Sequence, residues 1–101
     1  LYGTRADGKF TCLSPDGRAL WTSAASDNLG LGSFLLADGL LFVLNDSGQL
    51  RLLEATPTRH NELARAPVLP NGHESWGPMA LAGNRLLVRD LTRLICLQVG
   101  P

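Results

Sequence analysis

Segments of this 101-residue chain repeat at intervals of 40 to 45 residues, and this repetition constrains the fold more than any other feature. DGKFTCL at residues 7–13 aligns with SGQLRLL at 47–53, an offset of 40 residues. LADGLLFVLND at 36–46 aligns with LAGNRLLVRDL at 81–91, an offset of 45, and RLICL at 93–97 aligns with QLRLL at 49–53, an offset of 44. Because a repeat explains its residues by packing rather than by chemistry, the sequence is more informative about architecture than about reaction.

Turn signals separate short apolar segments along the chain. They are the pairs Asp7-Gly8, Asp16-Gly17, Asp38-Gly39, Ser47-Gly48 and Gly83-Asn84. Each pair is flanked by apolar segments of about four to seven residues, which is the pattern of hairpins whose turns need positive φ. Residues 59–66 (RHNELARA) are the best helical candidate, but they span about two turns between two prolines and have little apolar face. The pattern therefore predicts an all-β chain.

The apolar segments have the periodicity of strands. Residues 40–46 (LLFVLND) do not alternate, which suits a strand covered on both faces, whereas 49–55 carry Leu50 and Leu52 at period two, as in a half-covered strand. A repeat of about 40 to 45 residues built from four strands has the dimensions of a β-propeller blade. We expect strands at residues 1–5, 9–14, 19–23, 33–37, 40–45, 49–54, 62–66, 79–82, 85–89 and 94–99.

These strands predict β-propeller blades of four antiparallel strands, with about two and a half blades in the chain. Residues 1–101 then form a single partial propeller module, with a partial blade at 1–24, a complete blade at 30–67 and a partial blade at 76–100. Since a closed ring needs about four blades or more, we expect further blades or identical copies as partners. Leu1 is not an initiator methionine, so we interpret the chain as a processed or excised piece.

Charge and hydropathy exclude several classes of partner. Nine basic and nine acidic residues cancel without a run of one sign, so neither nucleic acid nor an anionic membrane surface is an expected partner. The longest apolar run, at residues 40–44, is far shorter than the roughly 20 residues of a membrane-spanning helix. The sequence predicts no membrane span.

The two cysteines occupy the same position of the repeat. Cys12 and Cys96 align with Leu52, and each of the three precedes a leucine. A position that accepts leucine as readily as cysteine is filled for its packing volume, so we expect both cysteines to be core residues. They do not form a C-x-x-C pair, and we expect no disulfide between them.

GKFTCLSPDGRALW at residues 8–21 resembles the repeat of PQQ-like (quinoprotein-type) β-propellers. In that repeat a glycine opens the third strand, an apolar run follows, a turn carries Asp and Gly, and a tryptophan closes the fourth strand. The matching residues are Gly8, Phe10, Cys12, Leu13, Asp16, Gly17, Leu20 and Trp21. The second unit keeps Gly48, Leu50, Leu52 and Leu53, and residues 75–99, with Cys96 and Leu97, are similar to the last units of such propellers.

The resemblance implies two alternatives. In quinoprotein dehydrogenases, pyrroloquinoline quinone and Ca²⁺ lie at the propeller centre, and a disulfide often joins adjacent cysteines. This chain has no adjacent cysteines, and Asp46, Glu54, Asp90 and Asn45 are too few to supply the six or more oxygens of a Ca²⁺ site. The larger branch keeps the fold without the cofactor. We therefore expect a non-catalytic scaffold or binding module without a cofactor, in an extracytoplasmic location by family resemblance, with a quinoprotein dehydrogenase fragment as the alternative.

The remaining candidates favour structural interpretations. GLGSFL at 30–35 lacks the third glycine of a dinucleotide loop and leads into a strand, so we interpret it as a linker between blades. His60 and His73 lack partners at metal or triad spacing and are expected to be solvated. Trp21 and Trp76 are expected to pack between blades. The turn-rich segment 65–78 is the candidate partner-binding loop, through His73, Glu74, Ser75 and Trp76.

Overall fold

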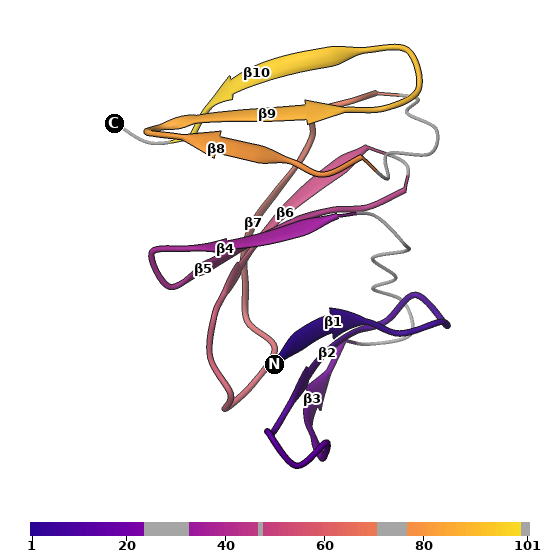
Figure 1. The fold of residues 1–101 in the computed structure, drawn as a ribbon, viewed down its shortest axis with the longest axis vertical. Coiled ribbons are helices and arrows are strands. Elements are labelled where there is room, and N and C mark those ends of the chain that lie inside the picture. The colour runs from indigo at the N-terminus through magenta and orange to yellow at the C-terminus, as the bar shows by residue number, and fades with distance from the viewer. Residues whose placement is uncertain (24–32, 47, 71–76, 100–101) are drawn as a thin grey trace.

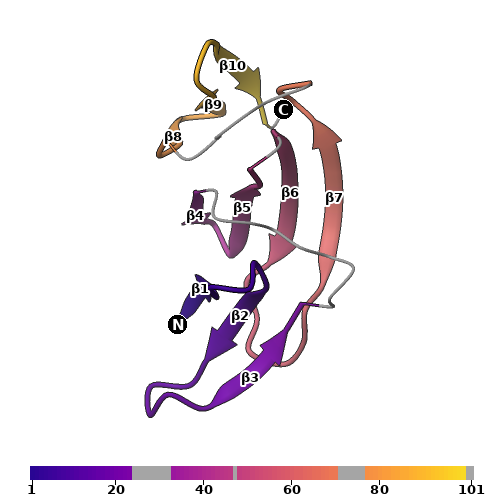
Figure 2. The ribbon, with the colours of Figure 1, turned by 90° about the vertical axis from the view of Figure 1, so that its right-hand side faces the viewer.

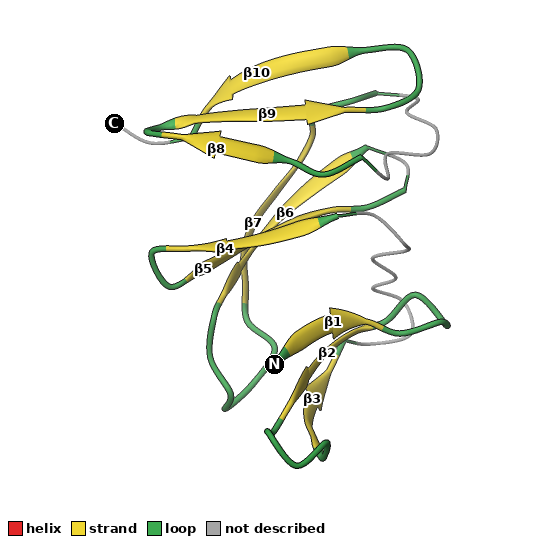
Figure 3. Cartoon of the chain, viewed as in Figure 1, coloured by secondary structure: helices red, strands yellow, loops and turns green. Residues whose placement is uncertain are grey.

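The chain folds entirely into strands and loops in its described part. The computed structural model describes residues 1–23, 33–46, 48–70 and 77–99, and these contain ten strands and no helix (Figures 1 and 3). The strands are β1 (Tyr2–Thr4), β2 (Phe10–Leu13), β3 (Ala19–Thr22), β4 (Phe34–Ala37), β5 (Leu40–Leu44), β6 (Gln49–Glu54), β7 (Glu62–Pro67), β8 (Ala80–Ala82), β9 (Arg85–Arg89) and β10 (Leu94–Gln98). The all-β prediction is confirmed, and each predicted strand is present within two residues of its expected ends.

The strands form three antiparallel sheets in which chain order is spatial order. The first sheet is β1-β2-β3, the second β4-β5-β6-β7, and the third runs β8-β9-β10. Figure 2 shows the sheets stacked along the longest axis, with β1, β4 and β8 along one side. A strand also occupies the segment that contained the helical candidate, because β7 pairs with β6 from Leu50 opposite Ala66 to Leu53 opposite Glu62.

The predicted hairpin turns adopt the backbone that their residues favour. Between β4 and β5, Asp38 has φ 52° and Gly39 has φ 73°, the two positive values of a tight two-residue hairpin. Gly48 (φ 89°) lies against a different part of the chain, because a Cβ atom there would lie 2.6 Å from the Cβ of Leu69 and closer still to its carbonyl oxygen. Position 48 therefore favours glycine for two reasons: its φ is positive, and a side chain there would overlap Leu69.

Two apolar clusters fill the spaces between the sheets. The first joins sheets one and two through Phe10, Cys12, Trp21, Leu41, Val43 and Leu53, with Tyr2 and Ala55 at its margin. The second joins sheets two and three around Phe42, Leu44, Leu69, Leu86 and Val88. Strand β5 contributes to both clusters, so the prediction that its apolar run is covered on both faces is confirmed.

Strand β6 differs from the half-covered strand that its leucines predicted. Leu50 and Leu52 are only partly buried, whereas Leu53 is fully buried and Arg51 is 6% exposed. The cause is that β6 lies between sheets one and three, so that Leu53 packs into the first cluster and Leu50 and Leu52 border the second. Both faces of β6 are thus covered, although the two differ in chemistry.

Candidate functional site

Most repeat positions serve packing or turns, as predicted. Phe10 and Leu53 are fully buried, Cys12 is 2% exposed, and Leu13 and Leu97 are partly buried. Gly8 and Gly17 have φ of 85° and 89° in the turns before and after β2. In the second turn the Ser14 hydroxyl and the Arg18 amide donate to Asp16, and the hydrogen bond from Ser14 is the main reason that the pKa of Asp16 is lowered.

Cys96 is the exception, and the prediction that it is a core residue is wrong. Its side chain is exposed, whereas that of Cys12 is buried, and neither forms a disulfide. The register explains the difference. On β10, Ile95 and Leu97 pair with the buried Val88 and Leu86, so Cys96 points to the opposite face of the third sheet, together with Leu87 directly across from it. In the described residues no sheet covers that face.

The repeat identifies this uncovered face of the third sheet with faces that pack against a neighbouring sheet elsewhere in the chain. Cys12 lies on the face of sheet one that packs against sheet two, and Leu52 lies on the face of sheet two that packs against sheet three. Cys96, at the same repeat position, lies on the face of sheet three that would meet a following sheet. We call this surface the open face and define it by Ala80, Leu87, Leu94 and Cys96, with Arg85 and Arg89 on the same face of β9. Leu87 is 40% exposed and Leu94 is 69% exposed.

Trp21 and His60 form a contact that sequence reasoning missed. Their rings lie 5.3 Å apart between centroids, and the Trp21 indole donates a 2.6 Å hydrogen bond to the carbonyl of Thr56. Trp21 packs between the first and second sheets, so the prediction that it fills the space between neighbouring units is confirmed. His60 is half-buried rather than solvated, and this burial lowers the pKa of its imidazole. The sequence contained no signal for this contact because His60 lies in a turn-rich segment.

A partly buried ion pair is the other group that the sequence did not reveal. The Arg51 guanidinium lies 3.4 Å from a carboxylate oxygen of Glu62 and donates to the side-chain carbonyl of Gln49. The Arg51 side chain is 7% exposed, and desolvation by burial is the main cause that lowers its pKa. Glu62 also pairs with Arg65 along β7. The Glu62 carboxylate thus compensates the positive charge of the buried Arg51 guanidinium.

The oxygens considered for a Ca²⁺ site are used within the chain. Asp90 accepts from the backbone amides of Thr92 and Arg93 and from the Arg93 guanidinium at 2.8 Å, and the Arg93 hydrogen bond is the main cause that lowers the pKa of Asp90 to about 2. Glu54 accepts from Asn61, and Asn45 accepts from the amide of Gln49. In residues 1–23, 33–46, 48–70 and 77–99, no three acidic, histidine or cysteine side chains are grouped as metal ligands would be.

The described residues do not include the central part of the predicted partner-binding loop. His73, Glu74, Ser75 and Trp76 lie outside the described residues, as does the glycine-rich start of the segment at 30–35. The partner-binding interpretation of that loop therefore stays a prediction.

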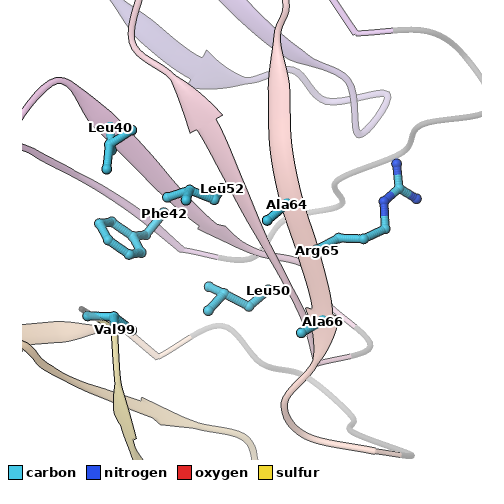
Figure 4. A pocket seen from close by; sticks show the side chains of 8 residues that line it. All are labelled: Leu40, Phe42, Leu50, Leu52, Ala64, Arg65, Ala66 and Val99. Atoms are coloured by element: carbon cyan, nitrogen blue, oxygen red, sulfur yellow. The ribbon is translucent and has the colours of Figure 1, made fainter. Parts of the chain in front are cut away.

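An apolar cavity lies between the second and third sheets near the chain's C-terminal strand. It has a volume of about 250 Å³ and is lined by Leu40 and Phe42 of β5, Leu50 and Leu52 of β6, Ala64, Arg65 and Ala66 of β7, and Val99. Figure 4 shows the leucines, Phe42 and Val99 around the cavity, while the Arg65 side chain extends away from it. The polar head of Arg65 is thus directed elsewhere, and the cavity suits an apolar occupant.

Comparison with known proteins adds no family assignment. Neither a protein-family model nor a curated protein sequence matches this chain. The residues that the structure describes contain no helix that could span a membrane. The open face and the apolar cavity are the candidate functional surfaces of the described residues.

Proposed function

We propose that this chain is a non-catalytic scaffold or binding module of the PQQ-like β-propeller type, whose outer sheet faces pack against further blades or against other copies of itself. The observation that carries the proposal is the open face. Positions equivalent to Cys96 are covered by a following sheet at Cys12 and at Leu52. The same packing chemistry is presented at Cys96 without a covering sheet in the described residues.

The number of sheets supports the association of this chain with further blades or with other copies of itself. The described residues form three sheets, fewer than the roughly four or more that close a propeller ring. Apolar side chains of the size of Leu87 and Leu94 contribute about 1.5–3 kcal/mol each when fully buried. Covering the open face with a further sheet is therefore favourable, and by the repeat the covering surface would resemble the Leu41, Val43 and Leu53 face of sheet two. We also propose an extracytoplasmic location, on the resemblance alone.

The experiment is the solution mass of the full chain, measured by light scattering on a sizing column over a range of concentrations. A discrete oligomer is expected, because the open face is available to a second copy. Leu87→Lys should dissociate it, since its charge would be desolvated at a covered position and the charged residues two positions away on the same strand, Arg85 and Arg89, have the same sign. Leu63→Lys on β7 is the matched control, because Leu63 is 51% exposed but lies outside the open face.

Two results would count against this proposal. A monomer at all concentrations contradicts association between copies, and then the covering sheets must come from other blades. A stoichiometric change in tryptophan fluorescence on adding pyrroloquinoline quinone with Ca²⁺ contradicts the non-catalytic assignment and favours the dehydrogenase alternative. We expect no such change up to high micromolar quinone.

A further inference from the structure

The junction between the first and second sheets contains an indole at a repeat position where the next junction has an alanine. Trp21 lies opposite Cys12 in the ladder of β2 and β3. The residue opposite Leu52, which is the repeat equivalent of Cys12, is Ala64. Trp21 is 9% exposed and reaches from the first sheet to the loop between β6 and β7, whereas Ala64 is exposed. At this repeat position, an indole therefore holds the first junction and not the second.

The loop between β6 and β7, residues 55–61, contacts the Trp21 indole at two points. The Trp21 indole N–H donates a 2.6 Å hydrogen bond to the Thr56 carbonyl. The His60 imidazole lies 5.3 Å from the indole between ring centroids, with the two ring planes at 41°. One short loop of the second sheet thus holds a side chain of the first sheet from both of its ends.

The surroundings of His60 disfavour a proton on its imidazole. Burial is the largest influence and lowers its pKa, while Glu62 of β7 raises the pKa and Arg51 of β6 lowers it further. Strand β3 carries no titratable side chain, and Arg59, the neighbour of His60 in the loop, is exposed. Tyr2 of the first sheet stays neutral near pH 7, because burial raises the pKa of its phenol. Neutral imidazole is therefore the form that fits against the indole.

We propose that Trp21, Thr56 and His60 form a pH-sensitive latch between the first and second sheets, closed while His60 is neutral and opened when it is protonated. A proton places a positive charge in a half-buried site, and that charge is better solvated when the loop moves into water. A solvent-exposed histidine has a pKa of about 6.5, so the open latch binds more protons just below that pH. The closed latch is therefore favoured near neutral pH and is weakened as the pH falls through this range.

The latch acts on the first apolar cluster and leaves the second unaffected. Trp21 packs with Phe10 and Leu53 in the first cluster, so release of the indole uncovers that cluster at its margin. The buried members of the second cluster are aliphatic residues and Phe42, which do not titrate. Neither Trp21 nor His60 belongs to the open face. The latch therefore does not depend on the proposed association, and each can fail without the other.

The test compares the exposure of Trp21 with the titration of His60 in the full chain. In a Trp76→Phe background, Trp21 is the single tryptophan. Acrylamide quenching of its fluorescence should increase about twofold or more between about pH 7.5 and about pH 5, because the open latch exposes the indole. Proton NMR of the unsubstituted chain should give a midpoint for the His60 imidazole below the roughly 6.5 of an exposed histidine. The quenching should follow the same curve, while circular dichroism shows that the strands persist.

A matched pair of loop variants assigns the effect to the imidazole. His60→Gln keeps a polar side chain that does not titrate, so it should remove the pH-dependent step in quenching and identify the His60 signal in the NMR spectrum by its loss. Arg59→Gln changes the charge of the exposed neighbouring residue and should retain the step.

Four results would overturn the inference. A His60 midpoint at or above about 6.5 would show that the imidazolium is stabilised against the indole by a cation–π interaction. Constant quenching of Trp21 while His60 titrates would show that the charge is tolerated in the closed latch. A quenching step that persists in His60→Gln would assign the step to another group. Loss of the strand signal over the same pH range would show that acid unfolds the chain as a whole.

Discussion

Cys12 and Cys96 hold the same position in the repeat, yet Cys12 is 2% exposed and Cys96 lies on an exposed sheet face. The difference does not come from their local sequence, since both precede a leucine at the same position of the repeat. It comes from the neighbouring sheet, because sheet two covers Cys12 and no sheet in the described residues covers Cys96. Burial at this position of the repeat therefore depends on whether a neighbouring sheet covers it.

The thiols should react at very different rates. In native protein diluted until the chain is monomeric, a thiol reagent such as DTNB should modify Cys96 rapidly and Cys12 only after unfolding, because the Cys12 sulfur is enclosed by the first apolar cluster. The released thiolate chromophore gives the count, which should be one per chain without denaturant and two with it. Cys96→Ser should remove the rapid phase. Rapid reaction of both thiols in native protein would show that the first cluster is not closed.

Substitution of two turn glycines should separate backbone strain from steric overlap. Gly17 and Gly48 both have φ 89°, but a Cβ at Gly17 meets nothing within 4 Å, whereas one at Gly48 overlaps Leu69. Gly17→Ala should lower the free energy of unfolding by about 1–2 kcal/mol through strain alone. Gly48→Ala should cost about 1–3 kcal/mol more, because Leu69 has to move. Urea denaturation measures both, and equal losses would contradict the close approach.

Trp21→Phe should destabilise the packing of sheet one on sheet two. The substitution removes the hydrogen bond to the Thr56 carbonyl and part of the ring that contacts Phe10 and His60. We expect a loss of about 1–3 kcal/mol in the free energy of unfolding. Leu20→Ala, at the neighbouring exposed position, should change it by about 0.5 kcal/mol or less. Thermal or urea unfolding followed by circular dichroism distinguishes the two, and similar losses would refute the contact.

Asp90 should make folding sensitive to acid. Its folded-state pKa of about 2 lies below the roughly 3.9 of an unfolded aspartate, so its stabilisation is present above about pH 4 and is lost as the pH falls toward 2. Asp90→Asn should therefore flatten the decline of unfolding free energy over that window. The exposed Asp38→Asn is the control, since asparagine tolerates the positive φ at that turn. An unchanged slope in Asp90→Asn would contradict the Asp90 and Arg93 pairing.

Strands and turns could be predicted because their determinants are local. Alternating or continuous apolar residues between Asp-Gly and Ser-Gly pairs specify where each strand begins and ends, and β6 and β9 were placed at their observed bounds. The repeat also predicted that neighbouring units pack together, and Trp21 and Leu53 meet in one cluster as a result. The bounds of the strands and turns thus depend on residues close together in the chain, whereas the contact between sheets followed from the repeat.

Only the tertiary structure decided which faces are covered and which groups meet. The exposure of Cys96 and the contact of His60 with Trp21 depend on segments far apart in sequence, and the burial of Arg51 beside Glu62 depends on how β6 pairs with β7. The same holds for the cavity beside β10, which needs residues from three strands and Val99. A sequence pattern gives a strand two faces, but burial requires a second surface about 10 Å away, and that surface is set by how the sheets stack.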